Sequence, residues 1–317
     1  MDIKYGRKRR GIKRQLHKVI EEWIESIQDE EVRKLCRLNT IVTGGSIASM
    51  LLGEQINDYD IYFRNKETAI KVTEYYIEEF NKRNSLEVKA GVIPYKPQIK
   101  LEDTINLKGE TEERVSIFCK SAGIASEGQE EYDYFESATD QQLVNFSESL
   151  AKSYGVESEI KDKFRPVFLS QNAITLSDKI QIIIRFFGEP DKIHSNYDFA
   201  HAMCYWDHQY QNLVMPAEAL ECLLSRTLIY RGSLYPIASI FRMKKFLERG
   251  WRISAGQQLK IMWQISEIDL TDIETVKDQL TGVDLAYLFE VITELNNSDP
   301  SSIDSTYVAE IIDRIFD

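Results

Sequence analysis

Apolar residues recur along this chain at two spacings, and each spacing predicts a different kind of element. Near the start the spacing is helical, at Leu16, Val19, Ile20, Trp23, Ile24 and Ile27, and it returns at Val32, Leu35 and Cys36. Because residues three and four apart share one face of a helix, two amphipathic helices are predicted there. We expect them to brace a first strand at Ile41-Val42.

Alternating or continuous apolar runs predict the strands. The run Ile180–Phe187 is almost wholly apolar and β-branched, which is typical of a central strand. The other predicted strands are 57–63, several short ones between 86 and 125, 164–169, 173–176 and 197–206. Helices are predicted between them at 47–52, at 66–83 and just after Pro190.

Only helical spacing remains after Pro216. Helices are predicted at 219–229, 237–249, 251–268, 273–280, 284–295 and 307–316. We therefore predict an α+β protein, with an α/β head followed by an all-helical C-terminal region. The expected units are 1–38 as a basic arm with bracing helices, 39–210 as the head with a β-rich insertion, and 211–317 as a helical neck and terminal bundle.

The turn Gly44-Gly45-Ser46 joins the first strand to the helix 47–52. Its two glycines let the backbone turn sharply, and Ser46 stands where a helix N-cap belongs. Free backbone N–H groups, a hydroxyl and the positive end of a helix dipole together make an anion site. Gly44, Gly45 and Ser46 are therefore the predicted phosphate cradle.

Two carboxylates follow on the second predicted strand. Side chains alternate along a strand, so Asp58, Asp60 and Tyr62 should share one face while the residues between them point to the core. Two close carboxylates repel unless a cation lies between them, and their oxygens suit Mg²⁺ that also binds phosphate. A phosphate cradle beside such a pair implies phosphoryl or nucleotidyl transfer. The alternative is a glycine turn followed by a strand with a solvated acidic edge.

The run from Gly44-Gly45-Ser46 to Asp58-Tyr59-Asp60-Ile61 resembles the signature of the DNA-polymerase-β-type nucleotidyltransferases, with Asp58 14 residues after Gly44. The spacing is most similar to the head domain of CCA-adding enzymes and bacterial poly(A) polymerases. The resemblance implies a mixed sheet with helices and transfer of a nucleoside monophosphate from an NTP to a hydroxyl. It also implies two Mg²⁺ ions, or Mn²⁺, on Asp58, Asp60 and a third carboxylate.

In that family the third carboxylate arrives on a later strand, and Tyr197-Asp198-Phe199 resembles this element. Asp198 is therefore assigned as the third catalytic and metal-binding acid, holding the metal that activates the attacking oxygen. Asp207, at the far end of the same predicted strand, is its competitor. An ordinary strand-capping acid is the remaining alternative.

The stretch from Tyr235 to Gly250 resembles the neck helix that follows the head in CCA-adding enzymes. Arg242, Lys245 and Arg249 are spaced three and four apart and therefore line one helix face. Arg242 and Lys245 are candidate nucleotide-binding residues, and a solvated face is the equal alternative.

Two family features are missing. CCA-adding enzymes carry an Arg-Asp pair in the short helix, where this chain has Ala48 and Ser49. A Glu-Asp-x-x-Arg segment, which reads the incoming base in that family, is also absent from the sequence. The resemblance therefore supports the fold and the transfer chemistry better than CTP-then-ATP selection.

Composition indicates the setting. The 317 residues are 43% hydrophobic and 28% charged, as in globular proteins, and no apolar run approaches the roughly 20 residues of a membrane span. We expect a cytoplasmic protein without a signal peptide or membrane partner. The four cysteines, at positions 36, 119, 204 and 222, lack C-x-x-C spacing and are expected to be reduced and buried. His201 is expected to be a packed core residue rather than a ligand.

Basic residues crowd the start of a chain whose net charge is −12. A cluster of five basic residues can bind a nucleic-acid backbone or remain a solvated arm: Lys8, Arg9, Arg10, Lys13 and Arg14.

The basic cluster and the neck favour RNA, such as a tRNA end, as the acceptor. A small molecule or protein, as in toxin- or antibiotic-type relatives, suits the acidic bulk better, and a catalytically weak module that binds RNA or protein is the third hypothesis. Oligomeric state is left open.

Overall fold

The computed structural model describes residues 6–83, 97–118, 163–170, 172–280, 291, 294–295 and 304–316. Several sequence predictions lie outside these residues: the strands expected at 86–96 and 119–125, Cys119, and most of the helix expected at 284–295. Within the described ranges, no helix combines the length and the apolar character that crossing a membrane requires.

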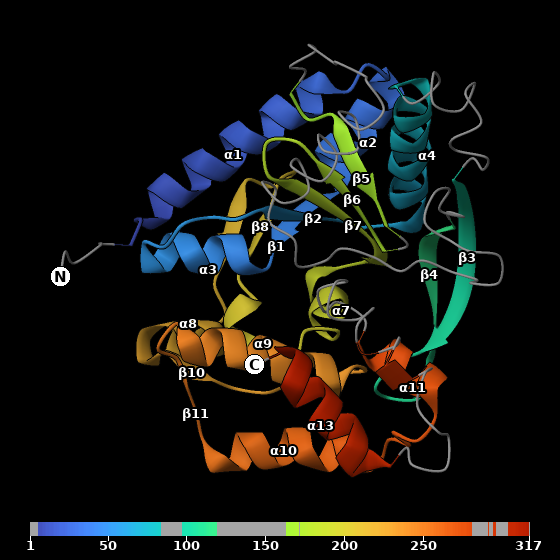
Figure 1. The fold of residues 1–317 in the computed structure, drawn as a ribbon. Coiled ribbons are helices and arrows are strands. Elements are labelled where there is room, and N and C mark those ends of the chain that lie inside the picture. Colours follow the sequence, from blue (N-terminus) through green and yellow to red (C-terminus); the bar gives the residue numbers. More distant parts are fainter. Residues whose placement is uncertain are drawn as a thin grey trace, which may run out of the picture.

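Seven strands of the described chain form a mixed sheet with the order β5-β6-β7-β2-β1-β8-β9 (Figure 1). Their bounds are β1 Thr40–Thr43, β2 Tyr59–Phe63, β5 Pro166–Leu169, β6 Ala173–Leu176, β7 Ile180–Phe187, β8 Tyr205–Asp207 and β9 Asn212–Val214. β2 pairs antiparallel with β1 and parallel with β7. With helices packed around this sheet, the predicted α+β class is confirmed, and β7 takes the interior place that its apolar run predicts.

One face of the sheet is covered by three helices, and we call it the helix-covered face. They are α1 Arg9–Ser26, α2 Glu30–Asn39 and α4 Lys66–Arg83. Fully buried side chains such as Leu16 and Trp23 of α1 pack in one core with Val42 of β1 and Ile61 of β2. The predicted bracing helices are confirmed, but α1 begins at Arg9, so most of the basic cluster is helical rather than an arm.

The opposite face carries Asp60, and we call it the carboxylate face. A separate small core lies on this face and contains Ile41, Tyr62 and Ile183 of the strands together with Ile193. Each of these strand residues is next in sequence to a residue that points into the main core on the other face. Ile193 comes from α7, Pro190–His194, the short helix predicted after β7. The alternation predicted for the second strand is confirmed for Asp60 and Tyr62.

A hairpin stands apart from the main sheet. β3 Gln98–Ile105 and β4 Thr111–Phe118 pair antiparallel along their whole length. Val115 and Ile117 of β4 are buried and join the main core. This hairpin confirms two of the short strands expected between 86 and 125.

Helices dominate the chain after residue 216, as predicted, and lie below the sheet in Figure 1. They are α8 Ala217–Ser225, α9 Pro236–Glu248, α10 Ala255–Ser266, α11 Ile273–Gln279 and α13 Ser305–Phe316. Ile237 and Phe241 of α9 share a second core with Val276, Val308 and Ile311. A short parallel pair, β10 Thr227–Leu228 with β11 Arg252–Ile253, was not predicted.

The strand predicted at 197–206 is wrong for most of its length. Ala200–Ala202 forms a 3₁₀ turn, η1, and only the end of the predicted segment enters β8. β8 pairs with three residues of the short strand β1. Before that point the backbone is held elsewhere, because Phe199 bridges to Tyr230 and the Ala200 N–H donates to Ile229 O at 3.1 Å.

Candidate active site on the carboxylate face

The turn after β1 is shaped by Gly44. Its φ of 96° is a conformation that favours glycine. A Cβ at this position would also lie 2.4 Å from Asp60 Oδ2, so space as well as backbone conformation excludes any side chain. The backbone of the turn therefore lies directly against the Asp60 carboxylate.

Helix α3, Gly45–Leu52, begins two residues earlier than predicted. Gly44 is its N-cap, so Ser46 lies inside the first turn, and the predicted N-cap role of Ser46 is wrong. The unusual backbone of Gly44 starts the helix without a side-chain cap. Gly53 follows the helix in the left-handed conformation that glycine favours at a helix end.

Ser46 is 2% exposed, and within the described chain its Oγ has no hydrogen-bond partner. An unpaired buried hydroxyl costs about 1–3 kcal/mol, which a ligand oxygen at the helix start would recover. Gly45 beside it is exposed, with open space where a side chain would be. The start of α3 therefore has an open approach and an unused donor, as a phosphate cradle requires.

Asp60 sits in the middle of the sheet, opposite Thr43 of β1 and Gln181 of β7. Asp58 precedes the strand, which begins at Tyr59, and its side chain is half-buried. Burial raises the pKa of Asp58, and the nearby Lys179 charge offsets only part of that effect. A buried carboxylate with a raised pKa gains when a cation binds beside it.

Thr43 lies opposite Asp60 on β1 and contacts His194, and Tyr197 lies within range of the Asp60 charge. The Thr43 hydroxyl is 2.8 Å from His194 Nε2 and donates to Cys204 O at 3.0 Å. Burial lowers the pKa of His194 to about 4, so this ring is neutral at physiological pH. Burial and the Asp60 charge raise the pKa of Tyr197. Thr43 and the neutral His194 ring thus form a hydrogen-bonded pair next to the strand position of Asp60.

Asp198 lies outside the carboxylate pair in this structure. Its carboxylate accepts a hydrogen bond from Arg242 Nε of α9 at 2.6 Å. Among the described residues, Asp58, Asp60 and Asp198 do not form a group whose oxygens lie within 4.8 Å of one another. Metal binding by Asp198 stays a prediction.

The competitor Asp207 lies at the other end of the β1–β8 ladder, opposite Ile41. It forms an ion pair with Arg64 and accepts from the Tyr210 N–H at 3.1 Å. The position directly across from Asp60 on β7 is occupied by an amide, Gln181, which is 8% exposed. Gln181 and Arg185 are the polar members of an otherwise apolar run, a sequence signal that can be recognised only afterwards.

The basic residues of the neck differ in burial and in contacts along α9. Arg242 is half-buried and joins α9 to the head through Asp198, whereas Lys245 and Arg249 are exposed further along the helix. The Arg249 guanidinium lies 5.8 Å from the centre of the Phe246 ring. Arg242 therefore approaches the residues around Asp60, and a triphosphate role for Lys245 stays a prediction.

The residues expected to be structural behave as predicted. His201 is 3% exposed, packs 4.4 Å from Phe246 and 4.7 Å from Trp251 between ring centres, and has its pKa lowered by burial to about 4. Three cysteines, Cys36, Cys204 and Cys222, are free and buried. Burial raises the pKa of each of them.

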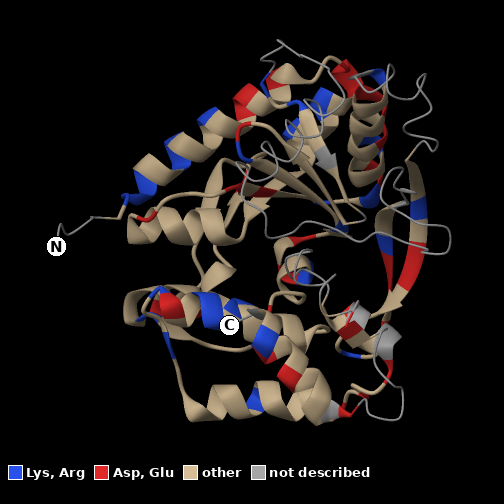
Figure 2. Ribbon diagram, in the orientation of Figure 1, with Lys and Arg blue, Asp and Glu red and all other residues tan. Residues whose placement is uncertain are grey.

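The basic cluster lies away from the carboxylate pair. Lys8 is the N-cap of α1, and the other four residues lie on the first turns of that helix, where Lys and Arg gather in Figure 2. These four helical residues line a hollow of about 580 Å³ together with His17, Trp206 and Gln211. Trp206 belongs to the core of the helix-covered face, so a ligand in this hollow sits across the sheet from Asp60.

Comparison with known proteins places most of the chain in one family. The model of the Gabija anti-defense 2 family protein matches residues 14–226. A relative named "Gabija anti-defense 2", from Bacillus phage SPbetaL7, is 24% identical over 107 residues. This match spans 33% of the present chain and 27% of the relative.

Solved structures with a similar chain path include tRNA-processing enzymes. A Thermotoga maritima CCA-adding enzyme complexed with tRNA has a TM-score of 0.37 and 12% identity, over 87% of this chain and 54% of that one. A Bacillus stearothermophilus CCA-adding enzyme in complex with CTP has a TM-score of 0.36 and 12% identity, over 86% and 51%. The chain thus spans about half of these enzymes, and values this low carry no information on reaction or substrate.

Proposed function

Since this chain belongs to the Gabija anti-defense 2 family, we propose that it counteracts a host defence by acting as a metal-dependent nucleotidyltransferase. The carboxylate face would transfer a nucleoside monophosphate from an NTP to a hydroxyl of the acceptor. The observation that carries the proposal is the Gly44 turn, which puts a helix start with the unpaired Ser46 hydroxyl against the Asp60 carboxylate.

The residues present fit a Mg²⁺ ion, with Mn²⁺ as a substitute. Asp58 and Asp60 would hold it, because both offer hard oxygen ligands and burial raises the pKa of Asp58, an effect that a bound cation opposes. When bound, the ion would neutralise charge on the triphosphate and polarise the phosphorus that is attacked. The chain itself supplies the cradle of Gly44, Gly45 and Ser46, and a neutral surround in which Thr43 and His194 hold β1 in place.

Arg242 and Asp198 give the proposal a second part. A triphosphate attracts a guanidinium, so a nucleotide at the α3 start would draw Arg242 away from Asp198. The released Asp198 carboxylate would then be free to turn toward the pair as the third acid and to take the proton of the attacking hydroxyl. In this scheme the ion pair of the described structure is the resting state.

The acceptor that fits best is a protein or small molecule of the defence system. The net charge of −12 opposes RNA binding over most of the surface, and the basic cluster of α1 lies across the sheet from Asp60. RNA remains the second candidate because that cluster has the composition of a phosphate-binding helix.

The test incubates the full chain with each α-labelled NTP and Mg²⁺ or Mn²⁺, separately with purified defence proteins, total tRNA and small-molecule extracts. Label should transfer to one acceptor class, and Asp60→Asn should abolish the transfer. Asp103→Asn, an exposed acid on β3, is the matched control and should transfer at the wild-type rate. Equal labelling by wild type and Asp60→Asn, or no labelled acceptor in any pool, would contradict the proposal.

A further inference from the structure

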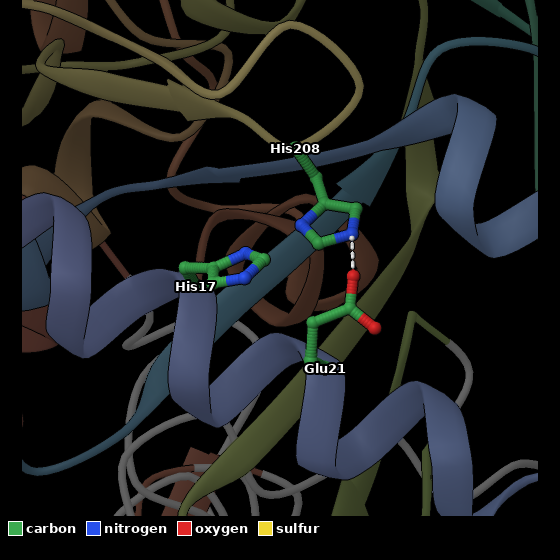
Figure 3. A group of neighbouring side chains, drawn as sticks. All are labelled: His17, Glu21 and His208. Atoms are coloured by element: carbon green, nitrogen blue, oxygen red, sulfur yellow. Dashed lines mark ion pairs between the residues drawn. The ribbon is translucent and has the colours of Figure 1, made fainter.

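A second group of metal-binding side chains lies on the helix-covered side of the sheet. One ring nitrogen each of His17 and His208 and one oxygen of Glu21 all lie within 4.8 Å of one another (Figure 3). In the described part of the chain this is the one set of three such residues. His17 and Glu21 are four residues apart on α1, hence on one face, and His208 follows β8.

The three side chains already interact. His208 Nε2 lies 3.0 Å from Glu21 Oε1, the contact dashed in Figure 3. His208 is 3% exposed, so its ring is fixed in place beside Glu21. Its other nitrogen, Nδ1, is buried and has no hydrogen-bond partner among the residues that the structure describes. A metal ion bound between His208 Nε2 and Glu21 Oε1 would take the place of their direct contact.

We propose that His17, Glu21 and His208 bind a divalent transition-metal ion of the zinc class. Two imidazoles and one carboxylate suit Zn²⁺, Co²⁺ or Ni²⁺ far better than Mg²⁺, which prefers oxygen ligands. Adjacent donors on a tetrahedral ion with bonds of about 2.0–2.1 Å lie roughly 3.3 Å apart, close to the His208–Glu21 contact. The site is thus distinct in chemistry from the carboxylate pair.

One side chain has to turn before all three donors meet on an ion. The His17 and His208 rings are nearly parallel, with planes at 20° and centres 6.0 Å apart, so their in-plane lone pairs do not converge. His17 is exposed, and its turn would give up only the 2.9 Å hydrogen bond between Nδ1 and Gln211. On the other side of the site, Arg37 lies 3.7 Å from Glu21 Oε2 and steadies the carboxylate, as outer partners of metal ligands do.

The position of the site gives it a consequence for the basic hollow. Arg9, Lys13, His17 and Glu21 are each four residues apart and face the β8–β9 hairpin. Arg9 donates to Leu213 O at 2.9 Å, and Lys13 Nζ lies 5.7 Å from the centre of the Trp206 ring. A bound ion would fix His17 and Glu21 and would thereby hold α1 against the hairpin. With three protein ligands, a tetrahedral ion would keep a fourth coordination position, which we place on the side of the hollow that His17 lines.

The experiment uses the full chain without an affinity tag, stripped of metal and then given Zn²⁺, Co²⁺ or Mg²⁺. We expect one zinc ion per chain by elemental analysis, a tetrahedral Co²⁺ absorption spectrum, and a rise in melting temperature of roughly 3 to 5 °C with Zn²⁺ but not with Mg²⁺. His17→Ala and Glu21→Gln should lose all three effects. Both sites are at least partly exposed, so neither change should unfold the chain.

Glu22→Gln, the neighbouring acid on α1, is the matched control and should bind zinc as the wild type does. Asp58→Asn should also retain the zinc, which separates this site from the proposed transferase centre. Zinc retained at full stoichiometry by both His17→Ala and Glu21→Gln would overturn the proposal. So would a folded wild-type chain that binds no zinc at micromolar free metal.

Discussion

The two faces of the sheet differ in charge and in what they can bind. On the carboxylate face, the turn at Gly44 lies against Asp60, the Ser46 hydroxyl has no partner among the described residues, and burial raises the pKa of Asp58. On the helix-covered face, the first turns of α1 concentrate Lys and Arg around a hollow (Figure 2). Since β1 and β2 separate the two, one small ligand cannot use both. Binding of a nucleotide and binding of a polyanion are therefore separable properties of this chain.

The largest expected effect comes from removing a carboxylate. Asp58→Ala or Asp60→Ala should lower the transfer rate at least about a hundredfold, roughly 3 kcal/mol of barrier, because the ion that neutralises the triphosphate is lost. Folding should be unchanged for Asp60→Ala and unchanged or improved for Asp58→Ala, since burial opposes the Asp58 charge. Single-turnover rates and urea unfolding measure both. Folded variants with wild-type rates would remove the pair from the chemistry.

The two glycines of the turn should differ sharply although they are neighbours. Gly44→Ala forces a non-glycine residue to φ 96° and pushes against Asp60, so we expect a loss of about 2–3 kcal/mol in unfolding free energy together with lost transfer. Gly45→Ala meets nothing within 4 Å and gains helix propensity, so its stability should rise or stay unchanged. Urea unfolding of the two variants tests the difference. Equal stability would show that the turn relaxes freely.

The Asp198–Arg242 pair allows two roles to be told apart. If Asp198 becomes the third acid, Asp198→Asn should cut transfer at least about tenfold while NTP still binds, because general acid–base assistance is lost. Arg242→Gln should then weaken NTP binding more than it slows transfer at saturating NTP. If the pair only fastens α9 to the head, both variants should lower the unfolding free energy by a similar amount, with transfer little changed.

The neutral state of His194, which contacts Thr43 next to Asp60, can be tested through the pH dependence of the unfolding free energy. His194 has a reference pKa of 6.5 that burial lowers to about 4 in the folded chain. As the pH falls from 6.5 to 4, the unfolded chain takes up this proton before the folded chain does, so stability falls, and it is fully present above 6.5. His194→Gln should flatten the slope of unfolding free energy against pH in this window by up to about 1.4 kcal/mol per unit. His201 shares the lowered pKa, so a residual slope should remain. An unchanged slope in the variant would mean that His194 is protonated in the fold.

Sequence patterns predicted most elements because local periodicity follows burial. The helix 66–83 and the central strand 180–187 match the structure in full, since each presents one consistent pattern. The segment 197–206 failed because its apolar composition is shared by a strand and by a buried irregular segment. What decides between them is the length of β1 and the bridge from Phe199 to Tyr230, neither of which is local.

The site was predictable where a short motif fixes the backbone. Gly44 and Asp60 come together because β1 and β2 are paired neighbours in the sheet that are joined only by this turn, α3 and a short loop. Asp198 meets Arg242, and His208 meets Glu21, across 44 and 187 residues, and no spacing rule predicts such contacts. The basic cluster was visible in the sequence, but its location across the sheet from Asp60 was not.

The smallest expected effect concerns that cluster and completes the contrast between the faces. Arg10 and Arg14 are exposed on α1 and line the hollow, so Arg10→Gln with Arg14→Gln should weaken binding of single-stranded RNA. Each phosphate contact contributes about 0.7 to the slope of log K against log salt, so the slope should flatten by roughly 1.4. Lys34→Gln with Lys108→Gln removes the same charge from exposed positions on other elements and should leave the slope almost unchanged. NTP affinity should be equal in both double variants, because the nucleotide would sit on the other face. A slope that falls equally in both would mean that only net charge matters, and a fall in NTP affinity confined to the α1 variant would mean that the two faces are coupled.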